Sequence, residues 1–300
     1  MPQPVPIVMT GATGLMGQML VKKLSQAAPD TALTCITRSP TQHSMLQAVN
    51  PNLTFISGDT ALPKTWQHIF AQYVPKTLIH LVQLRQIPTI LAALEPVQHL
   101  PRLIVIGTTG VYSRYNVYSQ EYQKAEAALS QYRGSYCVLR PTMIYGSHRD
   151  KNLHKLIKFC DRYGFFPVFG SGQCLLQPVH ADDLARALLA VFLNPEIQGT
   201  YDLSGGTVVS FLDLLTLVEK LLGKSVHPLR IPYGLGVVSA TLAERLLRTR
   251  SPIRKEQILR LQEDKAYSHA AATADFGYAP RSLEDGIVQE IALLRAEGII

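Results

Sequence analysis

The residues best suited to chemistry stand near the N-terminus, where an apolar stretch runs into three glycines. The stretch Val5–Thr10 is strand-like, Gly11, Gly14 and Gly17 follow it, and a helical pattern begins at once. Gly11 permits a tight turn, Gly14 lets a phosphate approach bare backbone, and Gly17 lets the new helix pack closely on a sheet. The first helical N–H groups and the helix dipole then favour an anion. The pattern predicts a nest for a dinucleotide pyrophosphate, and the alternative is a strand-to-helix turn without a ligand.

The next strand-like run, Ala32–Thr37, is followed by Arg38 and Ser39. A site specific for NAD usually has an acid here that binds the ribose 2′-hydroxyl. No Asp or Glu stands at this place. Arg38 offers a charge for a 2′-phosphate, with Ser39 or Thr37 as neutral donors. The pattern therefore favours NADP over NAD, and the alternative for Arg38 is a solvated surface arginine.

Two further strand ends carry polar side chains. Leu53–Ser57 is followed by Gly58-Asp59-Thr60, and Leu103–Gly107 is followed by Thr108 and Thr109. The Asp59 carboxylate is suited to accept from an adenine amino group or to cap the next helix. Thr108 would stand at the sheet edge where ligands bind, so it is the best candidate for a hydroxyl that contacts substrate. Hydroxyl groups also close turns, which is the alternative for Thr108.

Strand and helix patterns alternate through the first two hundred residues. Several of the strands are short continuous apolar runs, as expected when helices cover both faces of a parallel sheet. We therefore expect an α/β fold with a Rossmann-type doubly wound parallel sheet. The expected strands are Val5–Thr10, Ala32–Thr37, Leu53–Ser57, Thr77–Leu81, Leu103–Gly107 and Tyr136–Arg140, and the expected helices between them are Gly17–Ala27, Ile87–Leu94 and Val117–Gln131.

Later patterns are less regular and indicate a second, smaller unit. We expect residues 1–146 to form the dinucleotide-binding domain, with 178–203 returning to it because Ala181–Leu193 is a good helix. Residues 147–177 and 204–300 are expected to form a small substrate-binding lobe, with amphipathic helices at Phe211–Leu222 and Leu235–Leu247.

The composition narrows the classes of partner and compartment. Hydrophobic residues make up 47% and charged residues 17% of the 300, which supports a packed core and argues against disorder. The net charge is +7, but the basic residues are scattered, so an anionic small molecule suits the charge better than nucleic acid. The four cysteines show no CxxC spacing, and we expect them to be reduced in the cytoplasm. No apolar run of about 18 residues occurs, and a strand starts within five residues, so no membrane helix and no signal peptide are expected.

Taken together, these stretches resemble the extended or atypical short-chain dehydrogenases/reductases of the NAD-dependent epimerase/dehydratase group. The matching motifs, in family order, are Thr10–Gly17, Gly58-Asp59, Ile79–Leu81, Thr108–Tyr112, Arg140–Gly146, Pro178–Ala185, Gly199–Gly206, Phe276–Pro280 and Ser282–Gly286. The resemblance implies a bound nicotinamide dinucleotide. The predicted cofactor-binding residues are Gly11, Thr13, Gly14, Leu15, Met16, Gly17, Arg38, Ser39, Asp59, Thr60, Leu81, Val82, Thr108 and Pro141.

The family's catalytic motif is not intact in this chain. Family members use Tyr-x-x-x-Lys on one helix, with a Ser or Thr at the preceding strand end, and the resemblance puts Thr108 at that place. In one register Tyr118 takes the tyrosine position and Tyr122 the lysine position. In the other register Lys124 is the lysine, but Gln120 takes the tyrosine position. We predict Thr108 and Tyr118 as catalytic residues, and the alternative for Tyr118 is an aromatic packing residue.

Helix geometry separates Lys124 from Tyr118, because residues six apart lie about 240° apart around the axis. A tyrosine without such a lysine has a pKa of about 10, so at pH 7 it donates a proton but is a poor base. Reduction of a carbonyl is therefore easier for this chain than oxidation of an alcohol. Arg114 precedes the helix in a loop that could carry its charge toward the site.

The stretch Ser147–Lys158 is rich in basic side chains and follows the Arg140–Gly146 motif. In the family this region forms part of the substrate lobe, so a cationic helix here suits a phosphorylated or nucleotide-linked small molecule. A solvated helix face is the alternative. His148 and His154 have no carboxylate or cysteine at metal-ligand spacing, so no metal is expected.

Two functional hypotheses remain open from the sequence. The first is an NAD(P)-dependent oxidoreductase or sugar-nucleotide epimerase/dehydratase-like enzyme with a non-standard active site. The second is a non-catalytic NADP(H)-binding sensor or assembly protein, which the missing lysine favours. Ser251–Asp264 also resembles the tail of relatives of the 39-kDa accessory subunit of respiratory complex I, a branch that binds NADPH. The oligomeric state stays open, with a homodimer as one candidate.

Overall fold

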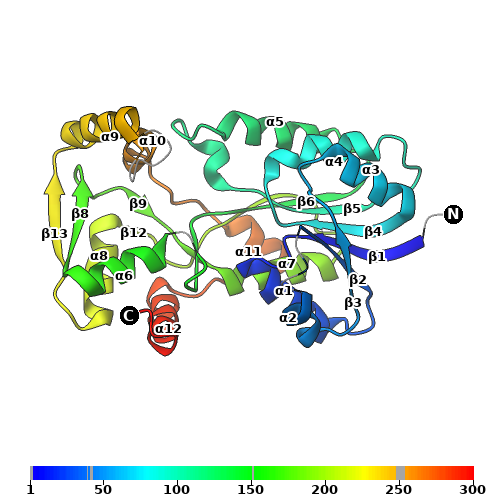
Figure 1. Cartoon of the computed structure of the whole chain (residues 1–300), viewed down its shortest axis with the longest axis horizontal. Coiled ribbons are helices and arrows are strands. Elements are labelled where there is room, and N and C mark those ends of the chain that lie inside the picture. Colours follow the sequence, from blue (N-terminus) through cyan, green and yellow to red (C-terminus); the bar gives the residue numbers. More distant parts are fainter. Residues whose placement is uncertain (1–2, 39, 41–42, 151, 248–253) are drawn as a thin grey trace.

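A seven-stranded parallel sheet lies at the centre of the computed structural model, which describes residues 3–38, 40, 43–150, 152–247 and 254–300. The strand order is β11-β6-β5-β4-β1-β2-β3. Helices cover both faces (Figure 1), and the predicted Rossmann-type α/β fold is confirmed. The strands are β1 (Gln3–Thr10), β2 (Leu33–Thr37), β3 (Leu53–Ser57), β4 (Tyr73–His80), β5 (Arg102–Ile106), β6 (Tyr136–Pro141) and β11 (Gly199–Leu203).

Two apolar cores form because the strands bury side chains on both faces of the sheet. Every residue of β2 is buried, as a continuous apolar run predicts. One core joins the sheet to α1 (Leu15–Ala27), α2 (His43–Val49), α7 (Ala181–Leu193) and α11 (Ala270–Phe276). The other joins it to α3 (Pro63–Gln72), α4 (Ile87–Leu94) and α5 (Ser119–Ser130).

The strand order reverses direction at β1, which lies between β2 and β4. The chain moves outward from β1 through β2 to β3, then crosses back to β4 on the other side of β1. Open parallel sheets bind ligands in the crevice outside the carboxyl ends of the strands at such a point. The ends of β1 and β4 therefore mark the place to look for a site.

Some elements differ from their expected bounds for local reasons. The expected strand Thr77–Leu81 begins earlier, at Tyr73, because β1 also begins early and pairs Gln3 with Tyr73. Helix α3 was not among the expected elements. It begins with Pro63, a residue suited to the first helical position, and it buries Trp66 in the core.

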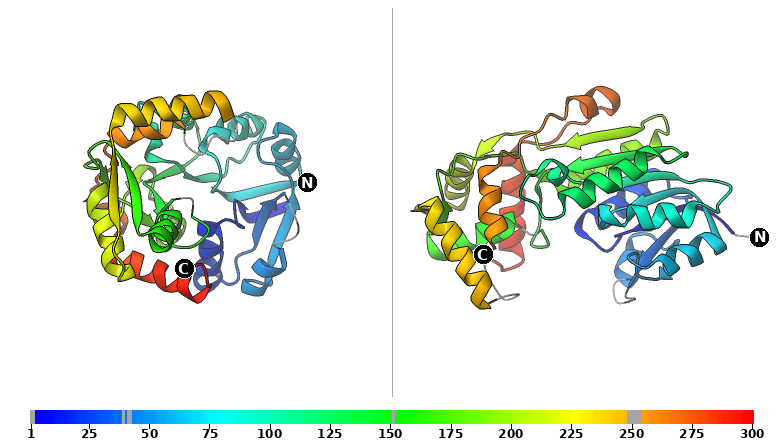
Figure 2. Two further views of the ribbon diagram at one scale, coloured as in Figure 1. Left: turned by 60° about the vertical axis from the view of Figure 1, so that its left-hand side comes forward. Right: turned by 90° about the horizontal axis from the view of Figure 1, so that it is seen from above.

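The second half of the chain contributes a third apolar core beside the sheet (Figure 2). This core is built mainly from α6 (Leu153–Tyr163), α8 (Phe211–Leu222) and α12 (Leu283–Ala296). Short strands frame it: β8 (Phe165–Phe169) pairs with β13 (His227–Ile231), β7 (Ile144–Tyr145) with β10 (Val179–His180), and β9 (Leu175–Leu176) with β12 (Val209–Ser210). The remaining helices are α9 (Tyr233–Leu247) and α10 (Lys255–Leu259).

The chain passes between the two halves more than once. After α6 and β8 it returns through β10 and α7 to the central sheet, where β11 pairs with β6.

All four cysteines are free, and Cys35, Cys137 and Cys160 are buried. No helix in the part of the chain that the structure describes is long and apolar enough to cross a membrane.

Candidate functional site

The glycine turn between β1 and α1 has the shape of an anion cradle. Gly11 has a φ of +72°, which favours glycine, and its carbonyl accepts a hydrogen bond from Gly14 N at 3.0 Å. A Cβ on Gly17 would overlap the Gly11 carbonyl oxygen and lie 2.8 Å from Ala12 Cα. The turn is therefore pressed against the first turn of α1, whose opening N–H groups have no partner within the helix. Of the other predicted cofactor-binding residues, Thr13 lies in this turn, and Leu15 and Met16 begin α1.

A side chain from the other half of the molecule, the part around the third apolar core of α6, α8 and α12, reaches the same turn. We call this part the second half of the molecule. Arg149 Nη2 donates to the Thr13 carbonyl at 2.7 Å, and Gln18 Nε2 donates to the same oxygen at 3.0 Å. The sequence contains Arg149 within a basic stretch, but nothing in the spacing places it at the glycine turn.

A buried histidine fixes the loop that follows β4. His80 has no exposed surface, and its Nδ1 lies 3.1 Å from Thr10 Oγ1, which also accepts from Leu81 N at 3.1 Å. His80 Nε2 lies 3.2 Å from the Gln83 carbonyl oxygen. Burial lowers the pKa of His80 to about 4. The neutral ring therefore holds Leu81, a predicted cofactor-binding residue, beside Gly11 of the glycine turn, and Val82 follows it in the chain.

Because its pKa is low in the folded chain, His80 makes folding depend on pH. An unfolded chain binds a proton on histidine near pH 6.5, whereas folded His80 does not until about pH 4, so stability falls as pH drops through this window. We expect His80 to account for a loss of about 2 kcal/mol in unfolding free energy between pH 7 and pH 5. Urea unfolding at both pH values checks this. The loss should shrink by that amount in His80→Gln, and an equal loss in both proteins would contradict the assignment.

The residues proposed to bind the ribose and its 2′-phosphate follow or end β2, and the two that the structure describes have different surroundings. Arg38 is exposed there, and Ser39 lies outside the described residues. Thr37 Oγ1 lies 2.7 Å from His43 Nε2, and the His43 ring stacks on Phe55 with centroids 3.8 Å apart. Thr37 is therefore engaged inside the protein, and Arg38 is the described side chain at this strand end that remains suited to a 2′-phosphate.

At the end of β3, the Asp59 carboxylate accepts from Ala61 N at 3.0 Å. The Thr60 carbonyl accepts from Trp66 Nε1 at 2.8 Å. Both residues thus shape the turn that leads into α3, but Asp59 does not cap that helix, because its N-cap is Leu62 and no described side chain bonds there. Asp59 stays partly exposed beside that turn.

Thr108 and Tyr118 lie on either side of the short loop between β5 and α5. Thr108 Oγ1 accepts from Gly110 N at 3.0 Å, whereas Thr109 is buried and donates to the Pro141 carbonyl at 3.3 Å. The Asn116 side chain approaches Gly110 on the same side as Thr108, and its Oδ1 accepts from Tyr118 N at 3.0 Å. Tyr118 is the N-cap of α5 rather than a residue inside the helix, and its side chain is 41% exposed.

A guanidinium covers the ring of Tyr118, although the motif's lysine is missing. The Cζ atom of Arg85 lies 4.5 Å from the Tyr118 ring centroid. Arg85 Nε donates to Gln83 Oε1 at 2.6 Å, and Nη1 lies 3.5 Å from Glu121 Oε2. Arg85 follows β4, so the loop that His80 holds also carries this charge. A basic residue close after a strand that ends at the ligand edge is a sequence signal for it.

The two candidates for the lysine position differ in burial. Lys124 is exposed, whereas Tyr122 is partly buried one turn after Tyr118. Burial raises the pKa of Tyr122, while the nearby charges of Arg85 and Arg260 lower it. The cations around this tyrosine pair therefore come from outside α5.

Tyr112 belongs to an ion network instead of facing a substrate unpaired. Its hydroxyl donates to Asp202 Oδ2 at 3.0 Å and accepts from Arg140 Nη1 at 2.6 Å. Arg140 Nε also donates to Glu126 Oε1 at 2.8 Å. Burial and the Asp202 carboxylate raise the pKa of Tyr112 to about 12. Tyr112 is thus a weaker proton donor than an ordinary tyrosine.

Glu263, which follows α10 in the sequence, binds the loop before α5. Glu263 Oε2 accepts from Ser113 Oγ and Glu263 Oε1 from Arg114 N, both at 2.6 Å. It is the main chain of Arg114 that is fixed, and the side chain is exposed. Glu263 was not among the predicted site residues, because no local pattern links it to Ser113, which lies 150 positions earlier in the sequence.

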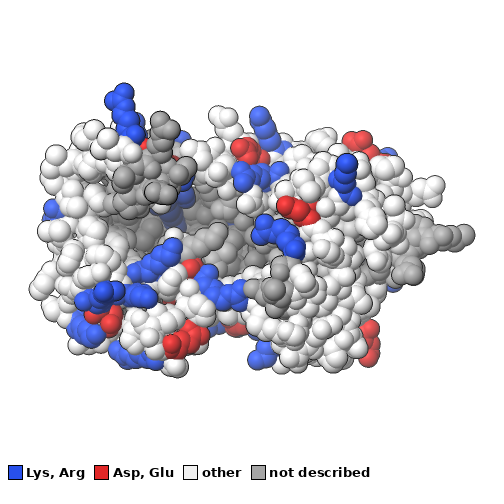
Figure 3. Space-filling view, in the orientation of Figure 1, with Lys and Arg blue, Asp and Glu red and all other residues white. Residues whose placement is uncertain are grey.

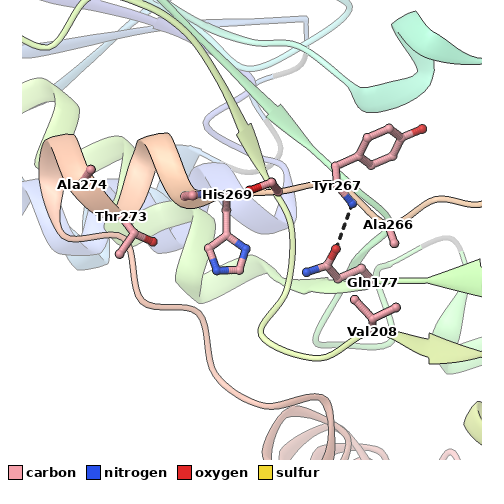
Figure 4. Close-up of a pocket in the computed structure, with 9 residues that line it drawn as sticks. Gln177, Val208, Ala266, Tyr267, His269, Thr273 and Ala274 are labelled. Atoms are coloured by element: carbon pink, nitrogen blue, oxygen red, sulfur yellow. Dashed lines mark hydrogen bonds between the residues drawn. The ribbon is translucent and has the colours of Figure 1, made fainter.

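Two hollows lie in the second part of the described chain or border it. Figure 3 shows a hollow between the two halves of the molecule, with basic side chains around the rim. A second hollow, of about 690 Å³, lies beside α11 and is lined by Gln177, His269 and seven other residues, none of them predicted for the site (Figure 4). Tyr267 turns its ring away from it and stacks on Tyr112, with centroids 5.2 Å apart. Within the described ranges, no three His, Cys, Asp or Glu side chains form a group that could hold a metal ion.

Solved structures similar to this chain share its whole fold. The structure of gox2253 matches 98% of this chain and 99% of its own, with a TM-score of 0.74 and 20% identity. The UDP-glucose 4-epimerase of Thermotoga maritima, solved with UDP-glucose, matches 98% and 99% with a TM-score of 0.72 and 18% identity. The UDP-glucuronic acid 4-epimerase of Bacillus cereus, solved with UDP-glucuronic acid and NAD, matches 98% and 100% with a TM-score of 0.70 and 19% identity.

Curated proteins match over about half of the chain. The mitochondrial NADH dehydrogenase [ubiquinone] 1 alpha subcomplex subunit 9 of Arabidopsis thaliana is 23% identical over 154 residues, which are 50% of this chain and 38% of that protein. Short-chain dehydrogenase/reductase family 42E member 1 of Danio rerio is 27% identical over 165 residues, 50% of this chain and 43% of that protein. The matched part thus spans less than half of the length of these relatives. The family model described as the NAD dependent epimerase/dehydratase family matches residues 7–99 and 105–203, and the chain belongs to that family.

Proposed function

We propose that the protein is an NADP(H)-dependent oxidoreductase that reduces a carbonyl group on a phosphorylated or nucleotide-linked small molecule. The observation that carries this proposal is the Arg85 guanidinium, 4.5 Å from the ring centre of Tyr118. It supplies a positive charge beside the tyrosine in a chain whose motif lacks the lysine. The glycine turn and the loop after β4 support a dinucleotide beside that tyrosine.

Each predicted residue has a role in this proposal. The N–H groups of the turn from Gly11 to Gly17 bind the pyrophosphate, and Arg38 binds the 2′-phosphate of NADP. A bound reduced nicotinamide supplies the hydride. Thr108 orients the carbonyl oxygen, and Tyr118 donates the proton that this oxygen takes up. Asp59, Thr60, Leu81, Val82 and Pro141 line the cofactor.

The substrate class follows from charge and from the neighbours' ligands. Basic side chains surround the hollow between the two halves of the molecule, which suits a phosphate or diphosphate (Figure 3). The Thermotoga and Bacillus epimerases were solved with UDP-sugars, which supports a nucleotide-linked substrate. The Bacillus structure holds NAD, so NADP is a separate proposal that depends on Arg38. The four free cysteines support a reducing compartment such as the cytoplasm.

A non-catalytic NADP(H)-binding protein, either a sensor or an assembly protein, is the second candidate. Tyr122 stands in the lysine position, and one relative is a subunit of NADH dehydrogenase. Both candidates require the cofactor site, so the chemistry at Tyr118 separates them.

Arg38→Ala tests the cofactor preference. Loss of charge-assisted hydrogen bonds to a phosphate removes about 1.5–3 kcal/mol, so NADPH should bind about 10- to 100-fold more weakly, whereas NADH binding stays the same. Thermal-shift titrations with both nucleotides measure this. Arg133→Ala is the matched control, because Arg133 is exposed in the loop that enters β6 from the opposite edge of the sheet. Equal NADPH affinity in Arg38→Ala and the wild type would contradict the NADP assignment.

A further inference from the structure

Arg149 carries a positive charge from the second half of the molecule to the edge of the glycine turn. Its Nη2 donates to the Thr13 carbonyl at 2.7 Å, a contact across 136 positions of sequence. Arg149 is exposed. Among the residues that the structure describes, the Thr13 carbonyl is its one side-chain hydrogen-bond partner. A guanidinium has five N–H donors, so this contact leaves four for another acceptor.

The main chain around Arg149 is held firmly while the side chain projects. Ser147 is buried, its Oγ accepts from Arg149 N at 3.1 Å, and its carbonyl accepts from Asp150 N at 3.0 Å. The Asp150 side chain is 1% exposed. Its Oδ1 accepts from Asn152 N at 2.7 Å and lies 3.1 Å from His154 Nδ1. These contacts tie the segment to the start of α6.

The C-terminal helix braces the same segment from the other side. Glu290 on α12 is buried, and the Asp150 carboxyl lies close to it. Burial and this second carboxyl raise the pKa of Glu290 to about 10, so Glu290 is protonated at pH 7. His148 Nδ1 also lies 2.5 Å from Glu297 Oε2, beyond the end of α12. Arg149 thus extends from a scaffold made by α6 and α12.

We propose that Arg149 is a second-half ligand for the pyrophosphate of the dinucleotide, so that cofactor binding ties α6 and α12 to the glycine turn. This inference rests on the proposed function, because the anion is that of the proposed cofactor. The backbone N–H groups of the turn bind one side of the phosphates, and the guanidinium adds charge-assisted hydrogen bonds from the opposite side. The contact also gives the cofactor a direct link to the half of the molecule that is expected to bind substrate.

Calorimetric titration with two probes tests the role of Arg149. ADP-ribose carries the pyrophosphate, and adenosine carries none. Arg149→Gln keeps a polar side chain but removes the charge and shortens the reach. We expect this variant to bind ADP-ribose about 10- to 100-fold more weakly than the wild type and adenosine equally well. Arg162→Gln is the control, because Arg162 is exposed near the far end of α6 and its guanidinium covers Tyr163.

A second readout tests the tie between the two halves. ADP-ribose should slow amide hydrogen exchange across Leu153–Tyr163 in the wild type and in Arg162→Gln, and not in Arg149→Gln. Equal ADP-ribose affinity in wild type and Arg149→Gln would overturn the inference while leaving the proposed function intact. A parallel loss for ADP-ribose and adenosine would mean that Arg149 only supports the fold of the turn. Absence of ADP-ribose, NADH and NADPH binding in the wild type would instead refute the cofactor site itself.

Discussion

Tyr118→Phe should lower the rate of NADPH-dependent carbonyl reduction by two orders of magnitude or more, the usual contribution of a general acid. The variant loses one hydroxyl and keeps the ring under Arg85, so the affinity for NADPH should not change. The measurement is the loss of NADPH absorbance with a carbonyl compound selected on the wild-type protein. Tyr163→Phe is the control, because Tyr163 is also exposed and stands at the end of α6.

Variants of Arg85 test the same proposal in a second way. Arg85→Ala removes the guanidinium over Tyr118, whereas Arg85→Lys keeps a cation at the same loop. We expect the alanine variant to lose most of the activity and the lysine variant to regain part of it. Wild-type turnover in Tyr118→Phe would contradict the role of Tyr118. A wild type that binds NADPH but reduces no carbonyl compound would favour the non-catalytic candidate.

Gly17→Ala is expected to have the second largest effect, on cofactor binding. The added Cβ would overlap the Gly11 carbonyl oxygen and press on Ala12, so the turn has to move away from α1. Overpacking of this kind lowers stability by about 1–3 kcal/mol. Displaced N–H groups also lose hydrogen bonds to the phosphates, and NADPH should bind about 100-fold more weakly.

A helical glycine with open space around it provides the matched control for Gly17→Ala. A Cβ on Gly234 in α9 would meet no atom within 4 Å, and alanine is the better helix former. Gly234→Ala should therefore keep both stability and NADPH affinity. Calorimetric titration and thermal unfolding of the two variants give both quantities. Normal NADPH binding in a folded Gly17→Ala protein would show that the nucleotide does not use this turn.

The sequence predicted the sheet well because its signals are local. Continuous apolar runs, glycine spacing and helix periodicity placed Leu53–Ser57, Ile87–Leu94 and Ala181–Leu193 at their observed bounds. The doubly wound parallel sheet followed from the alternation of strand and helix patterns, whereas the order of its strands was not predicted. Helix α3 went unpredicted because its burial of Trp66 depends on packing against distant strands.

Local sequence patterns did not predict most of the side chains that surround the site. Arg149 and Glu263 reach the site through contacts between separate segments, and their spacing in sequence carries no record of that. Arg85 has only a weak local signal, its position close after β4. Helix geometry predicted that Lys124 points away from Tyr118, and the structure shows Lys124 exposed on α5.

Titration calorimetry of the wild-type protein with NADPH and NADH is the most direct test of the central claim that this chain binds a nicotinamide dinucleotide at its glycine turn. We expect one binding site per chain for both nucleotides, with the tighter binding for NADPH. Heats no larger than those of dilution for both nucleotides would contradict the claim, and the turn from Gly11 to Gly17 would then serve only to pack α1 on the sheet.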